Sequence, residues 1–524
     1  MINATHLDQL NAQQLRETVL SLIETMANQS AVIERNDREI AFKQAFIDKL
    51  THEMAVLKRL KFAAQSEAYN AEQKSLLEDA IDTDLAALAA EIEQAAPPAQ
   101  GQDDKQKPKR QPLPGNLPRR EIHHEPENTL CACGCQLRRI GQDVAEKLDY
   151  QPGVFTVERH IRGKWVCAKC ETLIQASVPA HVIDKGIPTA GLLAQVLVAK
   201  YADHLPLYRQ EGIFARAGLA LPRSTLAQWV GQCGVQLQPL VDALRAELLE
   251  HSVLHADETP VAMLKPGNGK THRAYLWSYC TTSYNDTRAV VFDFADSRAG
   301  QHCRDFLGLP GENGWHGSLV CDDFSGYKAC FEMGVTEAGC LAHARRKFHE
   351  LWANHQSTIG ERALRFFIQL YDIEREVHEM DAAQRRRIRR QRSLPVADAM
   401  HLWLTEQRKK VPEGSATIKA IDYSLGRWQA LTRYIDDGEL PADNNWVENQ
   451  IRPIAIGRNN WLFAGSLRAG KRAAAVMSLV HSARLNGHDP YAYLKDILER
   501  LPTQPASRVE ELLPHRWQAP HATA

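Results

Sequence analysis

Apolar and polar residues are arranged in several patterns along the chain, and the first of them predicts long helices. Residues 5–95 contain no proline or glycine and are rich in Leu, Ala, Glu, Lys and Gln, a composition that favours helix. A seven-residue repeat, the spacing of a coiled-coil seam, is formed by Ile33, Ile40, Ile47 and Met54, with Leu50 and Leu57 at its second position. The pattern fits two copies of the chain pairing, and nearly as well an intramolecular helical hairpin.

The composition of the chain differs in residues 97–120. After this segment, the apolar and polar residues alternate in the way typical of strands. The segment 97–120 is rich in Pro, Gln and Lys, which predicts a linker. Residues 146–167 then alternate apolar and polar side chains, as strands do. Residues 188–233 are helical again, with Gly212 and Gly218 breaking the pattern before a helix that opens at Pro222, is capped by Ser224 and runs through Val230. Helix, glycine turn and helix predict a helix-turn-helix.

The second half of the chain predicts a mixed sheet followed by helices. SVLHADET, RAYLWSYCTT and RAVVFDFADS read as three strands, residues 297–307 as a helix and 318–321 as a fourth strand. This is the element order of a ribonuclease H-like sheet. Three helical blocks, 341–354, 362–392 and 417–437, precede a helix that opens at Asp443-Asn444-Asn445. We therefore expect a helical insertion within the sheet domain.

Composition limits the class of protein. A chain of 524 residues is too long for one compact core, and its net charge of −1 requires any nucleic-acid surface to be local. We expect no membrane span, because no run of eighteen apolar residues occurs, and no signal peptide, because the polar N-terminus lacks an apolar core.

The cysteines predict a structural zinc site. Five of the eleven cysteines fall in the clusters Cys131-Ala-Cys133-Gly-Cys135 and Cys167-Ala-Lys-Cys170, and tetrahedral Zn²⁺ takes four such thiolates from two turns. We favour Cys131 and Cys133 with the second pair, and Cys135 is the alternative. The strands between the clusters are the usual frame of a zinc ribbon; reduced structural thiols without metal are the competing interpretation.

Three acids predict a divalent cation site. Asp257 and Asp322 follow apolar strand-like runs, and Glu448 lies in the helix that opens at Asp443. Carboxylate oxygens suit Mg²⁺, and two such ions can clamp the attacking and leaving oxygens of a phosphoryl transfer. Their neighbours Glu258 and Asp323 cannot face the same cation, because strand alternation turns them away. We expect those neighbours to be surface or capping residues.

These motifs in this order resemble the insertion sequence 66 family of transposases. The segments ADETP, CDDFSGY, GCLAHARRKF and DNNWVENQIRPIAIGRNNWLFAGS carry the resemblance, which extends along nearly the whole chain. It implies a DDE triad of Asp257, Asp322 and Glu448 with two Mg²⁺ (or Mn²⁺), acting on terminal inverted repeats and target DNA. It also implies self-association through the helical seam, a homodimer or higher oligomer, and small accessory proteins. Where the family usually has Arg after the catalytic Glu, this chain has Asn449.

Basic and polar residues outside the triad are candidates for DNA contacts. In the region 465–471 the glycine spacing matches a phosphate-binding loop, but Arg472 stands where Ser or Thr would be needed, which argues against ATP. The helix that follows can hold a DNA phosphate at its N-terminus. The arginine-rich run 385–392 is either a backbone contact or a solvated face. The expected contacts are Arg223, Ser224, Thr225, Gln228, His343, Arg345, Arg346, Lys471 and Arg472.

The expected architecture is a multidomain α+β protein of six regions. They are a coiled-coil region (1–95), a Pro-rich linker (96–120), a zinc-binding module (121–185), a helix-turn-helix-like domain (186–245), a ribonuclease H-like DDE domain (246–465) with its insertion at about 341–440, and a C-terminal helical segment with a tail (466–524). The resemblance places the protein in a bacterial-type cytoplasm, associated with the nucleoid.

Overall fold

The chain folds as two compact units. The computed structural model describes residues 12–63, 71–95, 113, 115, 117–126, 130, 135–151, 153–183, 186–265, 270–311 and 313–519. One unit comprises Met1–Gln65 and Ala87–Lys109, and the other comprises Ser66–Ala86 and Arg110–Ala524. Cys131, Cys133 and the basic residues of the predicted linker from Lys105 to Arg110 lie outside the described residues, whereas Arg119 and Arg120 begin the first strand.

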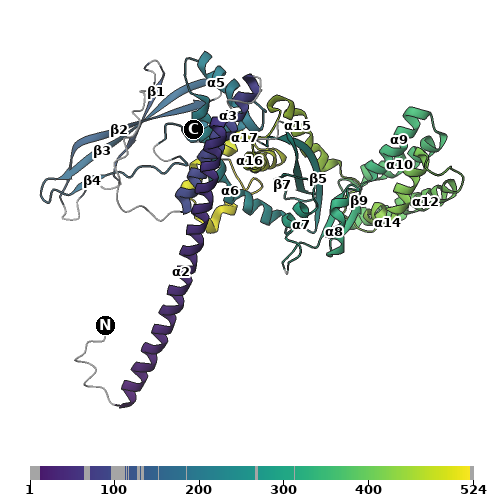
Figure 1. The fold of residues 1–524 in the computed structure, drawn as a ribbon, viewed down its shortest axis with the longest axis horizontal. Helices are drawn as coiled ribbons and strands as arrows, with labels where there is room; N and C mark the ends of the chain where they lie inside the picture. Colours follow the sequence, from purple (N-terminus) through teal and green to yellow (C-terminus); the bar gives the residue numbers. More distant parts are fainter. Residues whose placement is uncertain are drawn as a thin grey trace. The chain divides into compact units, whose positions relative to one another are not determined.

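The first unit consists of helices, as the absence of Pro and Gly predicts. Helix α2 (Ala12–Ala63) is continuous, and the end of α3 (Ala71–Ala95) belongs to the same unit (Figure 1). Ile33 and Ile40 of the predicted seam are exposed, whereas Leu50 is buried. The exposed part of the seam is the part that pairing between chains would cover, while a hairpin accounts for buried Leu50.

The predicted zinc module is built on an antiparallel hairpin of long strands. β2 (Leu137–Gln151) pairs with β3 (Val154–Cys167) along their whole length, β1 (Arg119–His124) pairs with β3, and β4 (Leu173–Gln175) completes the sheet. The register sets Leu137 opposite Cys167. Cys135 and Cys167 therefore lie at the same end of the hairpin.

The predicted helix-turn-helix is present as a helical pair, but its second helix differs from the expectation. α4 (Ala190–Tyr201) and α5 (Leu207–Arg216) precede α6 (Arg223–Leu248), which has 26 residues rather than ending at Val230. Pro222 is its N-cap and no side chain caps it, so the prediction of a Ser224 cap is wrong. A face of α6 that includes Leu226, Val230 and Leu237 is buried, because this helix is part of the main hydrophobic core.

The central sheet has the ribonuclease H-like arrangement. Its order is β7-β6-β5-β8-β9, formed by β5 (Val253–Met263), β6 (His272–Thr281), β7 (Val290–Ala295), β8 (Ser318–Cys321) and β9 (Thr336–Gly339). The first three strands are antiparallel, and β8 and β9 run parallel to β5. α7 (Gln301–Leu307) precedes β8, and η2 (Ser325–Tyr327) and α8 (Lys328–Glu332) follow it. The sequence did not predict β9.

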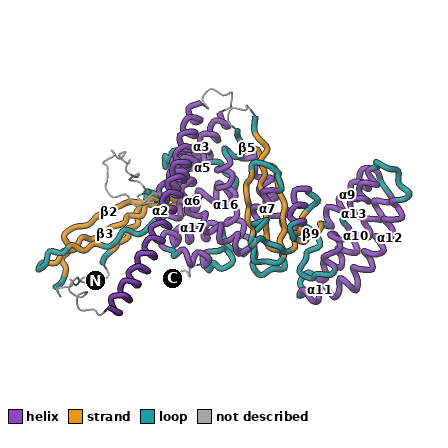
Figure 2. Tube along the Cα trace, turned by 60° about the horizontal axis from the view of Figure 1, so that its bottom comes forward, coloured by secondary structure: helices purple, strands orange, loops and turns teal. Residues whose placement is uncertain are grey.

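The helical insertion follows β9, and its hydrophobic core also includes Val253, Val320 and Ala338 of the central sheet. It comprises α9 (Leu341–His355), α10 (Thr358–Val377), α11 (Ala382–Ile388), η3 (Arg389–Ser393), α12 (Leu394–Arg408), α13 (Ala416–Gly426), α14 (Trp428–Thr432) and η4 (Arg433–Ile435). Phe348, Phe367 and Met400 lie in its core. Figure 2 shows α9, α10, α12 and α13 packed side by side.

Three helices return the chain from the insertion to the sheet. They are α15 (Asn445–Trp461), α16 (Leu467–Leu485) and α17 (Pro490–Arg500), followed by η5 (Leu501–Thr503) and η6 (Ala506–Leu512). The hydroxyls of Ser478 and Ser482 of α16 accept hydrogen bonds from the backbone N–H groups of Phe292 and Val290. These N–H groups of edge strand β7 therefore have hydrogen-bond partners. Trp517 of the tail is buried and donates to Asp496 at 2.7 Å.

The main hydrophobic core crosses two of the predicted domain boundaries. α4, α6, the central sheet, α16, α17 and the tail all contribute buried residues to it. The predicted boundaries at residues 245 and 465 therefore divide one packed body. Among the helices described here, none combines the length and apolarity needed to cross a bilayer.

Candidate active site

Asp257 and Asp322 lie at the same level of two neighbouring parallel strands. The register of β5 with β8 pairs Val253 with Ser318 and His255 with Val320. Each aspartate is two residues beyond that last pair, so the two side chains point to the same face of the sheet. Adjacent strands lie about 4.8 Å apart, which brings the two carboxylates into each other's field.

The helix that carries Glu448 is fastened to β5 immediately before Asp257. The side chain of Asn444 lies against His255 (Nδ1 to Oδ1, 2.8 Å) and donates through Nδ2 to the carbonyl of Ala256 at 2.9 Å. Its backbone N–H donates to Cys340 Sγ. The helix starts at Asn445, as predicted, but the Asn444 side chain bonds to the strand rather than capping the helix. Glu448 lies in the first turn of α15, shortly after Asn444.

The insertion supplies two partners to Glu448. His343 Nδ1 lies 3.8 Å from Glu448 Oε1, and Arg346 Nη2 lies 3.7 Å from Glu448 Oε2. Both partners come from the first turns of α9. Arg345 and Arg346 are both exposed on this helix, whereas His343 is half-buried. A role of His343 and Arg346 at the reacting centre stays a prediction.

The three acids influence one another electrostatically. Burial raises the pKa of Asp257 well above its ordinary value, and the charges of Glu258, Asp322 and Glu448 raise it further. Burial lowers the pKa of His343, although Glu448 and Asp322 favour its protonated form. A carboxyl that resists ionisation beside two other acids is the situation that a divalent cation relieves.

The donor atoms are of the kind that a hard cation takes, although they do not surround a single point. Asp257 Oδ1 accepts the N–H of Glu258, and Asp322 Oδ1 accepts that of Phe324, both at 2.9 Å. Glu448 Oε1 is buried and receives no hydrogen bond. Over the described part of the chain, no three His, Cys, Asp or Glu side chains form a ready-made metal cluster.

Comparison with known families shows to which family the chain belongs. Residues 185–472, more than half of the chain, match the family described as "Transposase IS66 family". The chain belongs to the IS66 transposase family. Three further matches are the "IS66 C-terminal element" over 478–515, the "zinc-finger binding domain of transposase IS66" over 128–171, and the "Transposase C of IS166 homeodomain" over 49–122.

Relatives of this IS66-family protein extend over most of the chain. The Sinorhizobium fredii protein y4qI is 37% identical over 90% of this chain and 89% of its own length. The protein y4jD of the same organism is 35% identical over 90% of this chain and 94% of its own. This protein is thus an enzyme of the DDE transposase family, whose chemistry depends on a divalent metal and acts on DNA.

Glu258 of this transposase is not the surface or capping residue that the sequence predicts. Its side chain is 1% exposed and pairs with Arg298, and Tyr327 donates to its Oε2 at 2.6 Å. Arg298 also lies over the ring of Phe324, 3.9 Å from the centroid. This buried network connects β5 with the loop after Asp322. Asp323, by contrast, is exposed as predicted and lies 3.5 Å from Arg427.

Three cysteines of the zinc finger, Cys135, Cys167 and Cys170, are among the described residues, and they do not form a group that could hold a metal ion. Cys135 packs against Leu137 and Cys167, and Cys170 Sγ lies 3.1 Å from Thr172 Oγ1. Which cysteines of the first cluster bind zinc stays a prediction, because Cys131 and Cys133 lie outside the described residues.

The four contacts expected from the helix-turn-helix lie at the start of α6. The backbone N–H of Arg223 donates to Glu211, and its guanidinium pairs with Glu78 of α3. Ser224 and Thr225 are half-buried, and only Gln228 is fully exposed. No local pattern in the sequence indicates that an acid of α3 meets Arg223.

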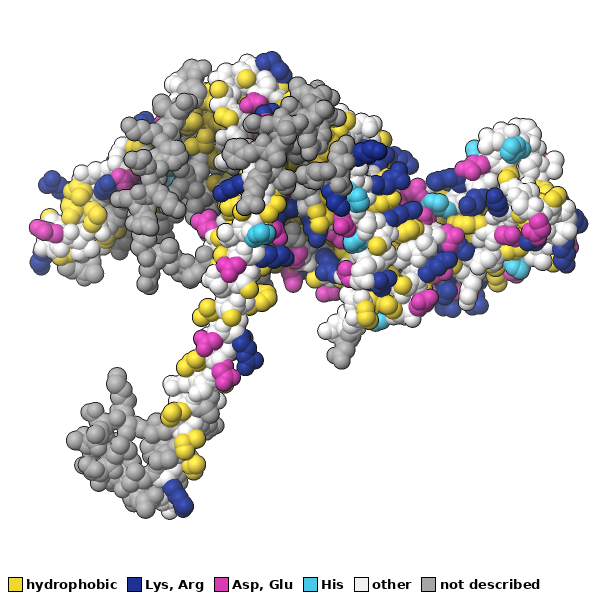
Figure 3. Space-filling view, in the orientation of Figure 1, with side chains coloured by type: hydrophobic (Ala, Val, Ile, Leu, Met, Phe, Trp, Pro, Cys, Tyr) yellow, Lys and Arg dark blue, Asp and Glu magenta, His cyan; other side chains and the backbone are white. Residues whose placement is uncertain are grey.

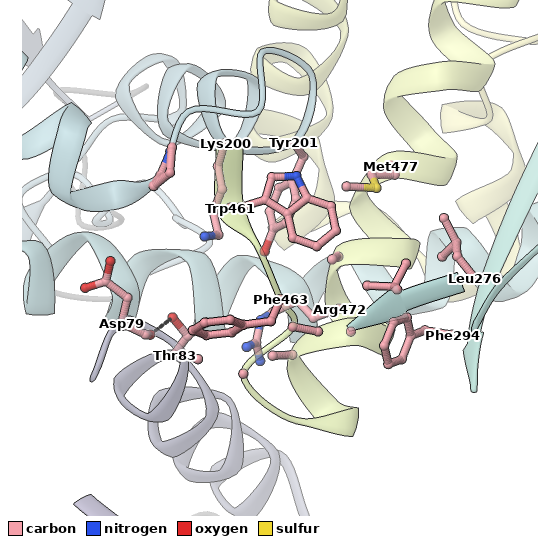
Figure 4. Close-up of a pocket in the computed structure, with 18 of the residues that line it drawn as sticks. Asp79, Thr83, Lys200, Tyr201, Leu276, Phe294, Trp461, Phe463, Arg472 and Met477 are labelled. Atoms are coloured by element: carbon pink, nitrogen blue, oxygen red, sulfur yellow. Dashed lines mark hydrogen bonds between the residues drawn. The ribbon is translucent and has the colours of Figure 1, made fainter. Parts of the chain in front are cut away.

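Arg472 does not reach the surface, contrary to the prediction that it holds a DNA phosphate. It is buried, and its Nη2 donates to Asp84 at 2.8 Å, while the neighbouring Lys471 is exposed. Figure 4 shows Arg472 beside a mostly apolar cavity between α3, α4, the sheet and α16, lined also by Asp79, Lys200 and Phe463. Asp257, Asp322 and Glu448 do not line this cavity.

Two arginines of the arginine-rich run 385–392 are buried. These two therefore neither contact DNA nor form a solvated face. Arg389 is fully buried, pairs with Glu374 and donates to the carbonyls of Tyr434, Asp437 and Leu440. Arg385 is also buried and donates to the carbonyl of Gly438 at 2.7 Å. These arginines fasten the insertion's last turns, while Arg386 and Arg387 are exposed.

Proposed function

We propose that this transposase binds the terminal inverted repeats of an insertion sequence, cleaves phosphodiester bonds at the ends and joins the 3′-hydroxyls to target DNA. The proposal is supported by the position of Asp257 and Asp322 at one level of two neighbouring strands, and by the helix of Glu448 being fastened to β5 beside Asp257. The mutual influence of these acids on the pKa of Asp257, and the unsatisfied Oε1 of Glu448, support a shared cation site.

The three acids would hold two Mg²⁺ (or Mn²⁺). When bound, the ions supply an activated water or 3′-hydroxyl and stabilise the leaving oxygen. The chain's own residues set the geometry. Asn444 fixes α15 against β5, so Glu448 stays over the strand that carries Asp257. Arg346, 3.7 Å from Glu448, offsets part of the negative charge before the cation arrives and can turn to a DNA phosphate.

Structural Zn²⁺ would stabilise the N-terminal DNA-recognition module. Cys167 and Cys170 supply one half of the site, and two thiols of Cys131, Cys133 and Cys135 supply the other. The packing of Cys135 against Cys167 supports including Cys135.

The partners follow from the reaction. Two transposon ends must be brought together, so the active form is a homodimer or larger assembly on double-stranded DNA, aided by small accessory proteins of the same element. Such an enzyme works at the bacterial nucleoid. We retain Gln228, Ser224, Thr225, Arg223, His343, Arg345, Arg346 and Lys471 as DNA contacts, and Arg472 is withdrawn because it is buried.

The test separates transposition from simple DNA cutting. The full chain is incubated with labelled transposon ends and a plasmid target, with and without Mg²⁺. Pre-cut ends carrying a 3′-hydroxyl are supplied in a parallel reaction. Covalent joining of pre-cut ends to the plasmid is the expected result. Cleavage without joining would instead indicate a metal-dependent nuclease, and end binding without either reaction would indicate a DNA-binding regulator.

A further inference from the structure

Helix α15 presents a continuous exposed row of side chains that starts beside the catalytic glutamate. Asn445, Asn449, Arg452, Ile456 and Asn459 are all exposed, and they are spaced by four, three, four and three residues. At 3.6 residues per turn this spacing places them on one face. The opposite face of the helix is buried in the core through Val447, Ile451 and Ile454, so the row cannot be explained by packing within the chain.

The chemistry of this row is that of a nucleic-acid contact. Three amides and one guanidinium flank Ile456, whose side chain is 66% exposed. Glu448, at the edge of the row, is the one carboxylate on α15. Asn and Arg are the side chains that make paired hydrogen bonds to base edges and phosphates, and an apolar side chain among them suits a thymine methyl group. Figure 3 shows Lys and Arg side chains gathered over the region of α15.

The far end of the row opens into a groove with both polar and apolar lining residues. The groove has a volume of about 460 Å³ and is lined by residues of β5, β6 and the end of α15, among them Arg273, Arg458 and Leu462. Arg458 donates to the carbonyl of Pro260 at 2.6 Å, which fastens the end of α15 to β5. Leu462 is 44% exposed and has a φ of +60°, a conformation that is unfavourable for any residue with a side chain. An exposed apolar residue held in this way beside arginines is the kind of element that DNA-binding proteins press against bases.

The two anchors of α15 define its direction relative to the active site. Its start is tied to Ala256, next to Asp257, and its end to Pro260, farther along the same strand. The helix thus leads away from the acids beside β5. From Glu448 to Asn459 it rises about 16 Å, the length of about five base pairs of B-form DNA.

We propose that the exposed row of α15 and the groove at its end bind the double-stranded DNA that flanks the scissile phosphate, over about the first five base pairs. This inference rests on the proposed function, since it assumes that DNA is held at the acids. The helix that carries Glu448 thereby has a second role, which is to hold DNA next to the active site. Asn449, which replaces the family's usual arginine, becomes a DNA-facing residue.

The first experiment measures the affinity of the full chain for labelled end DNA. Arg452→Ala is expected to weaken binding between about fivefold and a hundredfold and to reduce the slope of log affinity against log salt by about 0.9. Arg365→Ala is the control, because Arg365 is an exposed arginine of α10 that pairs with its helical neighbour Glu361 at 2.7 Å. The thermal unfolding of each variant is recorded as well. Because the Arg452 side chain is exposed, we expect its removal to leave the melting temperature unchanged.

The second experiment locates the contact. Ile456→p-benzoyl-phenylalanine is photo-crosslinked to end DNA, and the modified nucleotide is expected about three to four base pairs from the scissile phosphate, from the rise of the helix. Normal binding by the wild type with no effect of Arg452→Ala, or crosslinks only far from the cleavage position, overturns this inference alone. Failure of the wild-type chain to bind end DNA overturns both the inference and the proposed function.

Discussion

The side chains of His255 and Asn444 meet at 2.8 Å in the interior, and this contact fixes the third acid relative to the first. Asn444 uses Nδ2 to donate to Ala256, so its Oδ1 accepts the proton of His255 Nδ1. Burial lowers the pKa of His255 to about 4, which keeps the ring neutral at physiological pH and able to hold this tautomer. The pair therefore positions α15 without adding charge near the acids.

Asn444→Ala should consequently damage both stability and catalysis. It leaves the buried Nδ1 of His255 without an acceptor, which costs about 1–3 kcal/mol of unfolding free energy. With α15 loosened, we expect the Mg²⁺ concentration for half-maximal DNA cleavage to rise severalfold. Denaturant unfolding and a Mg²⁺ titration of cleavage measure the two effects. Asn354→Ala, at an exposed position of α9, serves as the control, and equal Mg²⁺ requirements in the two variants would contradict the positioning role.

The raised pKa of Asp257 predicts that metal binding depends on pH. Its carboxyl holds a proton to higher pH than an ordinary Asp because of burial and the neighbouring acids. A cation must displace that proton, so the affinity for Mg²⁺ or Mn²⁺ should rise as pH rises and protons should be released. Calorimetric titrations in two buffers of different ionisation heat count the protons. Asp257→Asn should abolish the release, and an affinity that is constant with pH would refute this assignment.

Asp79 predicts a stabilising substitution away from the active site. Burial raises its pKa to about 6, against the attraction of Lys200 and Arg223, and neither carboxylate oxygen receives a hydrogen bond. Because the folded state binds this proton more tightly than the unfolded chain, stability is lost as pH rises from about 4 through about 6. At pH 7 Asp79→Asn should therefore raise the unfolding free energy by about 1–3 kcal/mol.

The advantage of Asp79→Asn should disappear below pH 4, where the wild-type carboxyl is protonated in both states. Thermal unfolding across this pH range is the measurement. Asp398→Asn, at an exposed position of α12, should show no such dependence. A gain of equal size at pH 4 and pH 7 would mean that the ionisation of Asp79 is not the cause.

The zinc finger gives a prediction about the metal content of the purified protein. Purified protein should contain one zinc per chain, and Cys167→Ser should lose it because a four-thiolate site does not tolerate a missing ligand. The packing of Cys135 against Cys167 predicts that Cys135→Ser loses zinc as well. Metal analysis of the purified variants decides the point. Full zinc content in Cys135→Ser would return the first half of the site to Cys131 and Cys133.

Much of the catalytic domain could be predicted from sequence because its signals are local. β5 and β8 are apolar runs that end near acids, and the Asp-Asn-Asn segment marks the start of α15. β9 was missed because four residues, two of them Thr336 and Glu337, carry too little apolar pattern to mark a strand. The strand β9 forms because parallel pairing with β8 gives its backbone N–H and C=O groups hydrogen-bond partners.

The errors concern charged residues whose partners are remote in sequence. Arg389 looked like part of a basic surface, yet Glu374 and the carbonyls of residues 434–440 hold it in the interior. Arg472 looked like a phosphate contact, yet Asp84 lies against it. A run of arginines has the same local pattern in both situations, so only the fold shows which of them are buried.

The central claim is that Asp257, Asp322 and Glu448 act together as one metal-dependent centre for DNA cleavage. The most direct measurement compares the wild type with Glu448→Gln on labelled transposon ends, recording end binding and Mg²⁺-dependent cleavage in the same samples. Our account predicts that Glu448→Gln binds ends with nearly wild-type affinity and reduces cleavage by at least about a thousandfold, as loss of an essential catalytic group does. Cleavage by Glu448→Gln at a rate close to that of the wild type would contradict it.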